Sequence, residues 1–130
     1  MKEKRKQKKP RPSNPSPAIA RFLNIWRGRK WEALGDALQI TYTQTNPGAW
    51  LEAATILAGL PLEKAKVLKR INVSPVLVDY HVACEYTDGR EPEVRIVRMV
   101  CERSAYEPDR CGTWGVNPIS VYRTLGGGEP

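Results

Sequence analysis

The sequence has few of the residues that build catalytic and metal sites. His81 is its one histidine, which excludes nearly every arrangement in which a histidine activates a nucleophile and a third group orients that histidine. No CxxC pair, GxSxG turn or glycine-rich phosphate loop occurs. His81 and Cys84 are three residues apart on an expected strand, so their side chains point to opposite faces. The sequence predicts no catalytic residue, no cofactor and no metal site.

Long apolar runs and regularly spaced cysteines are also absent. No apolar stretch approaches 18 residues, which predicts no membrane-spanning helix, and no apolar segment near the beginning suggests a secretory signal. The three cysteines, Cys84, Cys101 and Cys111, are odd in number and widely spaced, which argues against a disulfide framework. We expect all three to be small buried hydrophobic residues. These features favour a cytoplasmic protein that does not contact membranes.

What the sequence does have is positive charge at one end. The formal net charge is +7, and residues 1–17 contain seven basic residues against one glutamate, leaving 14 basic and 13 acidic residues elsewhere. This proline-rich tail has almost no apolar side chain to bury, so we expect it to be disordered. Two interpretations stay open: a solubilising extension, or an arm that binds nucleic acid or an acidic partner. The candidate nucleic-acid-binding residues are Lys2, Lys4, Arg5, Lys6, Lys8, Lys9 and Arg11.

Apolar residues at intervals of three and four predict helices in the first half of the chain. The first covers residues 19–26, and the second continues over 31–43. A third helix has Asn46 as its N-cap with Pro47 at its first helical position, and it ends at Gly59. The chain length suits one domain, which we expect at residues 18–124, followed by a flexible C-terminus at residues 125–130.

The second half of the chain predicts antiparallel strands. Residues 61–75 are compatible either with a helical turn from Pro61 or with the beginning of a strand. From Val76 to Tyr86 the pattern alternates between apolar and polar residues, and a turn at Asp88-Gly89 leads into a second strand over residues 94–103. Val97, Met99 and Cys101 are expected to extend the buried face of the first strand.

The opposite face of the two expected strands mixes apolar and charged residues. Its members are Leu77, Asp79, Ile96, Arg98, Val100 and Glu102. Such a patch is a candidate dimer surface, and the alternative is an ordinary solvated face with scattered apolar residues.

A third strand is expected in the segment CGTWGVNPISVYR. Trp114 and Val116 should face one side, Asn117-Pro118 should form a bulge, and Ile119 and Val121 should then continue inward. We favour core packing over a site role for Trp114, because large aromatic side chains are usually buried.

The order of three helices followed by antiparallel strands resembles the nuclear transport factor 2-like (NTF2-like) superfamily, which includes SnoaL-like and ketosteroid-isomerase-like domains. The similar segments, which cover about residues 18–123, are FLNIWRGRKWEAL, VLVDYHVACEYTDG, VRIVRMVCE and GTWGVN. The resemblance implies an α+β fold of the cystatin-like kind, with N-terminal helices packed on a curved antiparallel sheet. It also implies a cone with an internal cavity, and frequent pairing of two copies through the sheet.

Family members include isomerases, dehydratases, cargo binders and non-catalytic domains. The isomerases use a carboxylate base opposite an acid or phenol, but no local motif here justifies the transfer of those roles. The aromatic residues that would line a pocket are Trp26, Trp31, Tyr42, Trp50, Tyr80 and Trp114, although a packed core is the favoured role for such residues.

The function that we expect is a non-catalytic NTF2-like binding or assembly domain, forming a homodimer, with a basic arm for nucleic acid or acidic partners. One alternative is a small cavity enzyme of the isomerase or dehydratase type, whose carboxylates would come from Asp36, Glu52 or Asp79. Another is a structural component of a phage or mobile element, suggested by the compact size and the lysine-rich leader.

Overall fold

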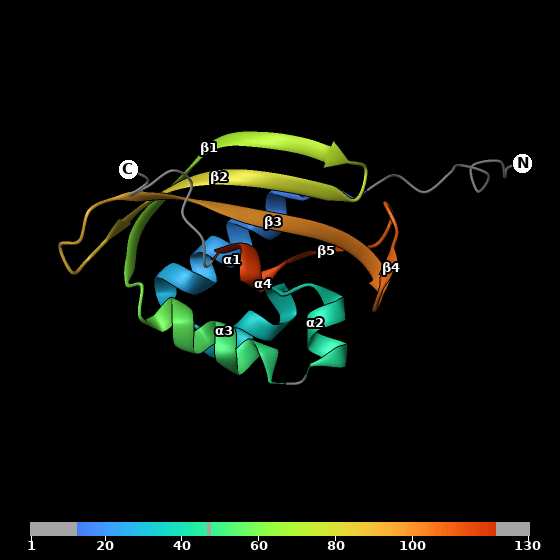
Figure 1. Cartoon of the computed structure of the whole chain (residues 1–130), viewed down its shortest axis with the longest axis horizontal. Coiled ribbons are helices and arrows are strands. Elements are labelled where there is room, and N and C mark those ends of the chain that lie inside the picture. Colours follow the sequence, from blue (N-terminus) through green and yellow to red (C-terminus); the bar gives the residue numbers. More distant parts are fainter. Residues whose placement is uncertain (1–12, 47, 122–130) are drawn as a thin grey trace, which may run out of the picture.

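The computed structural model of the chain describes residues 13–46 and 48–121 (Figure 1). The expectations for residues 1–12 of the basic tail, for Pro47 and for the C-terminus at residues 125–130 lie outside the described residues. Residues 13–17 of the tail do not follow the expected disorder, because a helix begins at Ser16 and Ser13 forms hydrogen bonds to Arg110 and Gly112. The elements, in chain order, are α1 (Ser16–Gly28), the 3-10 helix η2 (Trp31–Ala37), α2 (Ile40–Thr45), α3 (Ala49–Ala58), β1 (Leu62–Ser74), β2 (Leu77–Tyr86), β3 (Glu93–Ser104), β4 (Glu107–Pro108), β5 (Thr113–Val116) and α4 (Pro118–Val121).

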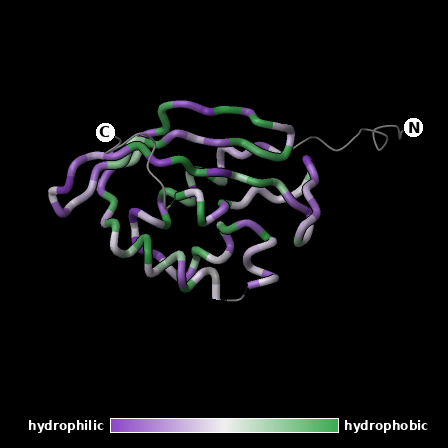
Figure 2. Tube along the Cα trace, viewed as in Figure 1, coloured by the Kyte–Doolittle hydropathy of each residue, from purple (hydrophilic) through white to green (hydrophobic). Residues whose placement is uncertain are grey.

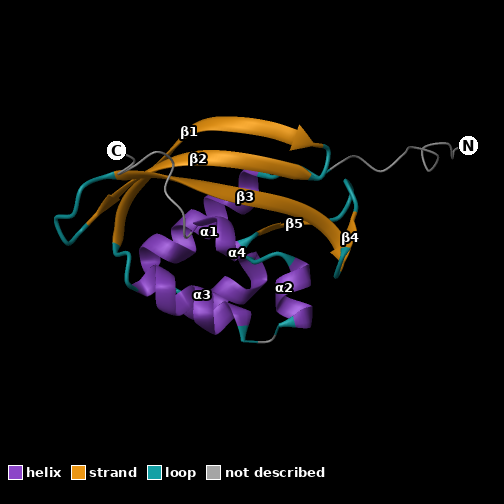
Figure 3. Ribbon diagram, viewed as in Figure 1, coloured by secondary structure: helices purple, strands orange, loops and turns teal. Residues whose placement is uncertain are grey.

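The architecture is α+β, as the sequence predicted, with helices preceding an open antiparallel sheet. The sheet has five strands in the order β1-β2-β3-β4, and β5 also pairs with β3. Figure 1 shows three long curved strands above the helices, with α1 passing behind the sheet and α2 and α3 below it. The two short strands β4 and β5 lie toward one end of β3 (Figure 3).

The core lies between α1 and one face of the sheet. Val82 and Cys84 of β2 and Met99 of β3 are fully buried, together with Phe22 and Trp26 of α1. Alternate residues of β2 are buried, as a strand with one covered face requires. Figure 2 shows hydrophobic positions on both strands and helices, with hydrophilic positions between them. The predicted core face, including Val97 and Cys101, is therefore confirmed.

The predicted helix over residues 31–43 is wrong in its middle. The structure has a 3-10 helix that ends at Ala37, an extended step at Leu38 and Gln39, and then the short helix α2. Leu38 forms a parallel bridge with Val116, and the Gln39 N–H donates to the Val116 carbonyl at 2.8 Å. Because these groups bond to the sheet, they do not continue a helical ladder.

The third helix ends at Gly59 as predicted, but it begins later than expected. Gly48, not Asn46, is its N-cap. Asn46 instead terminates α2, because its N–H donates to the Tyr42 carbonyl at 3.1 Å. Of the two alternatives for residues 61–75, the strand is observed, as β1.

The expected strand beyond Asn117 is also wrong. Trp114 and Val116 are buried in β5 as expected, but the chain then forms the short helix α4, and Ile119 is 46% exposed. The Asn117 carboxamide oxygen accepts the Ile119 N–H at 3.0 Å, and Pro118 suits the first helical position. This local chemistry starts a helical turn where alternation alone suggested a strand.

The free edge of the sheet is interrupted by three irregularities. The pairing of β1 with β2 shifts around Glu63, Leu68 and Val73, which leaves these residues without a partner in the register. Leu68 and Val73, the exposed apolar residues among them, are 53% and 51% exposed. Bulges of this kind twist an edge and disfavour pairing with another strand.

We predict that Gly115→Ala lowers the free energy of unfolding by about 2 kcal/mol or more, because the added methyl group overpacks the interior. Its Cβ would lie 2.5 Å from the Leu38 carbonyl oxygen and 2.6 Å from the Gln39 Cα. Denaturant unfolding monitored by circular dichroism would measure the loss. Gly35→Ala is the matched control, since the nearest atom to its new Cβ is 3.9 Å away and we expect a change within about 0.5 kcal/mol. Equal effects of the two substitutions would contradict the close approach at Gly115.

Candidate anion-binding site

A pocket of about 430 Å³ lies where β1 approaches the segment that precedes α1. Arg70 and Asn72 of β1 line this pocket, together with Trp114 of β5 and Arg110 of the turn before it. Ser13, the first described residue, also lines it. None of the described residues that line this pocket is acidic. The pocket therefore has a positive lining contributed by segments far apart in the sequence.

The two arginines of this pocket are available to bind an anion. The Arg70 Nε–H donates to the Asn72 carboxamide oxygen at 2.8 Å, and its guanidinium lies 6.0 Å from the centre of the Tyr80 ring. Among residues 13–46 and 48–121, neither Arg70 nor Arg110 forms an ion pair. Guanidinium groups bind phosphate oxygens through paired hydrogen bonds, so the arrangement suits a phosphate or another oxyanion.

Three hydrogen bonds fix the first described residue beside this pocket. The Ser13 N–H donates to the Arg110 carbonyl at 2.9 Å, and the Ser13 hydroxyl donates to the Gly112 carbonyl at 2.6 Å. The Trp114 indole N–H donates to the Ser13 carbonyl at 2.9 Å. Arg11 precedes Ser13 by two residues in the sequence. Ser13, the first described residue after the basic residues of the tail, therefore lies at the arginine pocket.

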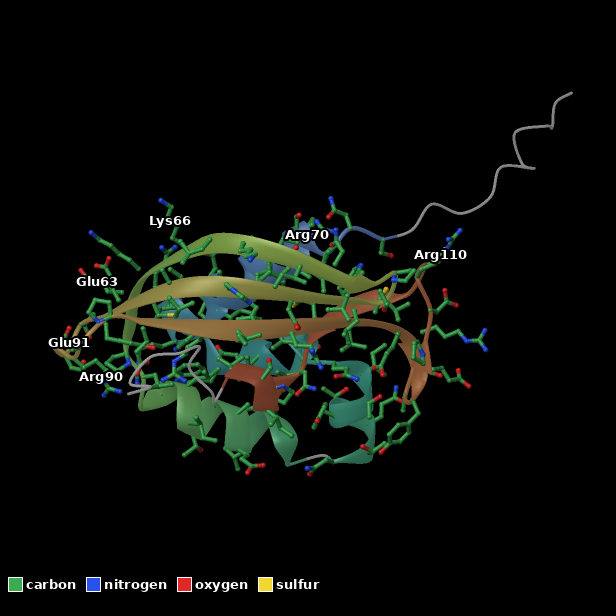
Figure 4. The ribbon with its side chains drawn as sticks, turned by 45° about the horizontal axis from the view of Figure 1, so that its top comes forward. Glu63, Lys66, Arg70, Arg90, Glu91 and Arg110 are labelled. Carbon is green, nitrogen blue, oxygen red and sulfur yellow. The ribbon has the colours of Figure 1, made fainter. Side chains whose placement is uncertain are left out.

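Further positive charge follows β1 along the free edge of the sheet. Lys64, Lys66 and Lys69 are exposed and pair with β2 residues of the face opposite the core. Arg70 pairs with Tyr80 of the core face, so the edge strand carries basic side chains on both of its faces. Figure 4 shows Lys66 and Arg70 along this edge and Arg110 farther along the molecule.

The structure does not gather the predicted aromatic pocket residues into one site. Trp26 is buried in the core, and its indole N–H donates to the Leu60 carbonyl at 2.9 Å. Trp31 is half-buried, with the Arg29 guanidinium 5.5 Å from its ring centre. Trp50 is 41% exposed on α3.

The other three aromatic candidates also lie apart from one another. Trp114 lines the arginine pocket, whereas Tyr42 lines a separate pocket beside α2. Tyr80 is buried, and its hydroxyl has no hydrogen-bond partner among the described residues. Trp114 is therefore the one member of the predicted set at the arginine pocket.

The carboxylates considered for a cavity enzyme are not buried together. Asp36 and Glu52 are exposed, and Asp79 forms a two-bond ion pair with Arg98 at 2.8 and 2.9 Å. The buried carboxylate is Glu102, which is 2% exposed. Sequence alternation assigned Glu102 to the less buried face, and no local pattern indicated that α2 would cover it.

A buried polar cluster ties the end of β2 to β3 and α4. Arg95 is 6% exposed. Its guanidinium donates to the Tyr86 hydroxyl at 2.8 Å, the Glu93 carboxylate at 2.7 Å and the Val121 carbonyl at 2.7 Å. Burial opposes ionisation of Glu93, but hydrogen bonds from Tyr86 and Arg95 outweigh it and lower its pKa. Because these groups satisfy one another, the cluster serves as a clamp between elements.

The cysteines do not all behave as expected. Cys84 and Cys101 are buried free thiols, as predicted, but Cys111 is exposed. The cause is its place in the turn before β5, where its N–H donates to the Asp109 carboxylate at 2.8 Å. A residue in such a turn has no sheet face against which to pack.

Comparison with known proteins gives no relative from which to transfer a role: no family model, curated protein or solved structure matches this chain. Within the part of the chain that the structure describes, no helix is long and apolar enough to cross a membrane. The same residues hold no group of three or more histidine, cysteine or acidic side chains placed to bind a metal ion.

We predict that stability falls between pH 9 and pH 11, because burial raises the pKa of Cys84 from 9.0 to about 11. In that interval the unfolded chain loses the proton while the folded chain retains it, so rising pH favours unfolding. The expected loss is on the order of 1 kcal/mol per pH unit, measured by urea unfolding at each pH.

Cys84→Ala should reduce this slope, and Cys111→Ala is the matched control that should retain it. Burial also raises the pKa of Cys101 above its ordinary value of 9.0 and that of Tyr86 above its ordinary value of 10.0, so a residual slope remains in Cys84→Ala. Identical slopes in Cys84→Ala and the unaltered protein would contradict the assignment to Cys84.

Proposed function

We propose that this protein is a non-catalytic nucleic-acid-binding module, in which the basic N-terminal tail acts together with the arginine pocket. The observation that carries the proposal is the attachment of Ser13 to Arg110, Gly112 and Trp114. Ser13, which follows residues 1–12 of the tail, thus lies at a pocket lined by Arg70 and Arg110, neither of which has an ion-pair partner among the described residues. We propose that the tail and the arginine pocket, two sources of positive charge that are distant in the sequence, act as one surface.

The chemistry of this surface favours the phosphate backbone over the bases. Arginine and lysine contacts with phosphates release condensed counterions, which gives affinity without sequence preference. Trp114, the aromatic residue of the pocket, is 7% exposed, and its indole N–H is already bonded to Ser13. It is therefore poorly placed to stack on a base, and we propose binding that is independent of sequence.

We also propose that the fold is the NTF2-like cone and that two copies pair through the sheet in the cytoplasm. The helix-then-sheet order and the curved strands support the first part (Figure 1). The face opposite the core supports the second, since Val94, Ile96 and Leu77 are half-buried there around the Asp79–Arg98 ion pair. A two-fold axis near Ile96 would bury the same patch of both copies.

Nucleic-acid binding should weaken steeply with salt, and removing residues 2–12 should make it less salt-dependent. Arg70→Gln and Arg110→Gln should each lower the slope of log K against log salt by about one, because each removes about one phosphate contact. Fluorescence anisotropy with a labelled duplex and a labelled single strand, at several salt concentrations, measures this slope. Arg27→Gln, an exposed arginine on α1, is the matched control and should leave the slope unchanged.

Two results would overturn this proposal. One is a slope that none of the deletion and pocket variants alters. The other is equal binding of polyglutamate and of nucleic acid of matched charge, which would assign the surface to an acidic protein partner.

Ile96→Lys should convert the proposed dimer into a monomer, because it places a charge at the centre of the paired faces. Light scattering coupled to size-exclusion chromatography gives the mass. Leu51→Lys is the control, since Leu51 is 59% exposed on α3 and lies off the sheet. A monomeric unaltered protein, or a dimeric Ile96→Lys variant, would contradict the pairing.

A further inference from the structure

A second pocket, of about 590 Å³, lies between α2, the end of β3 and β4, and shares no lining residue with the arginine pocket. The part that matters chemically is formed by Gln39 and Thr41 with Glu102 of β3. Tyr42 and Tyr106 also line the pocket. The proposed nucleic-acid surface makes no use of these groups.

The central group of this pocket is the carboxylate of Glu102, which is 2% exposed. One of its oxygens accepts the Thr41 N–H at 3.0 Å, and the other accepts the Thr41 hydroxyl at 2.5 Å and the Gln39 carboxamide N–H at 2.9 Å. All three partners donate, as an ionised carboxylate requires. No lysine or arginine among the described residues forms an ion pair with Glu102. A buried negative charge is thus left without a counter-charge, which is costly in a protein interior.

A purely structural role for Glu102 at the start of α2 explains the three donated bonds but not Gln39. Gln39 is 8% exposed, and its carboxamide oxygen is buried with no hydrogen-bond partner in the described chain. Rotating the carboxamide by half a turn would not help, because it would place that oxygen against the carboxylate of Glu102. The pocket lining therefore includes an unsatisfied acceptor, which needs a donor, next to a buried carboxylate, which has hydrogen bonds but no ion-pair partner among the described residues.

The cation that already lines the pocket does not meet this need. Arg98 gives its Nε–H and one terminal N–H to Asp79, at 2.8 and 2.9 Å. Leu77, Val100 and Pro108 add apolar surface to the lining. A ligand with several N–H donors and one positive charge on an apolar body would suit the Gln39 carboxamide oxygen, the Glu102 carboxylate and the apolar lining together.

We propose that this pocket binds a small planar organic cation of the amidinium or guanidinium class. One N–H edge donates to Glu102 and a neighbouring N–H donates to the carboxamide oxygen of Gln39. The apolar part of the ligand lies against Leu77, Val100 and Pro108. This site is independent of nucleic-acid binding, and either function can fail without the other.

The test uses the full-length protein and three probes of nearly the same shape: benzamidine, the neutral benzamide and the anionic benzoate. Isothermal titration calorimetry gives the affinities, and amide chemical shifts locate the site. Benzamidine should bind at least about tenfold more tightly than benzamide, because only benzamidine provides the charge that the buried carboxylate lacks, and benzoate should not bind. Comparable affinities for benzamidine and benzamide would overturn the proposal, as would benzamidine shifts at residues outside this pocket.

Glu102→Gln should lower benzamidine affinity at least about tenfold while keeping the size of the side chain. Glu91→Gln makes the same chemical change at an exposed carboxylate in the β2–β3 turn (Figure 4) and should leave the affinity unchanged. Thr45→Trp provides a second route if Glu102→Gln does not fold, because Thr45 is exposed and lines the pocket, so the indole should block it. Unchanged benzamidine affinity in a folded Glu102→Gln or Thr45→Trp variant would overturn the site.

Discussion

The rest of the structure depends on the contact between residues 38–39 and β5. The Leu38–Val116 bridge and the hydrogen bond from the Gln39 N–H to the Val116 carbonyl attach the helical half of the chain to the sheet. Gly115 permits this contact, because any larger residue would overlap the backbone of Leu38 and Gln39. The same contact interrupts the helix that the apolar pattern of residues 31–43 suggests, and it turns α2 toward the end of β3.

Both pockets follow from this attachment, on opposite sides of one short stretch of β3. Cys101 pairs with Trp114 on the core face, and the Trp114 indole binds Ser13 at the arginine pocket. The next residue, Glu102, points to the other face, where Gln39 and Thr41 reach it only because residues 38–39 have been fixed against β5. Because successive strand residues point to opposite faces, Cys101 faces Trp114 of the arginine pocket and Glu102 faces the second pocket.

The sequence predicted well those features that depend on local periodicity. The buried faces of β2 and β3 could be assigned because apolar and polar residues alternate along each strand. The turn between them could be assigned from Asp88-Gly89, where Gly89 has a positive φ. The failure over residues 31–43 has a non-local cause, because the backbone of Leu38 and Gln39 bonds to Val116, which is far away in the chain. Helical hydrogen bonds at Leu38 and Gln39 compete with the pairing of these residues to Val116. A local stretch of sequence around Leu38 does not include Val116, so it cannot reveal this competition.

The candidate sites were less predictable for the same reason. Arg70 and Arg110 are separated by forty positions, so their common pocket exists only after β1 and the β4–β5 turn have been placed. Glu102 was assigned to the correct face, yet its burial depends on α2, whose position follows from the contact of residues 38–39 with β5. The basic tail was evident from charge alone, but its point of attachment required the Ser13 hydrogen bonds.

Burial gives the two proposed sites different physical characters. Arg70, Arg110 and the lysines of β1 are exposed, so dissolved ions screen them over a Debye length of about 8 Å at physiological salt. Glu102 is buried, and its attraction for a cation is screened far less.

A surface built from exposed charges gains affinity by releasing counterions and tolerates variation in its ligand. A buried carboxylate beside an unsatisfied carboxamide selects its ligand by shape and by the number of donors, because an imperfect ligand leaves a polar group unpaired. One small domain thus carries both kinds of charge at separate places, exposed cations along β1 and at the arginine pocket and a buried carboxylate beside α2.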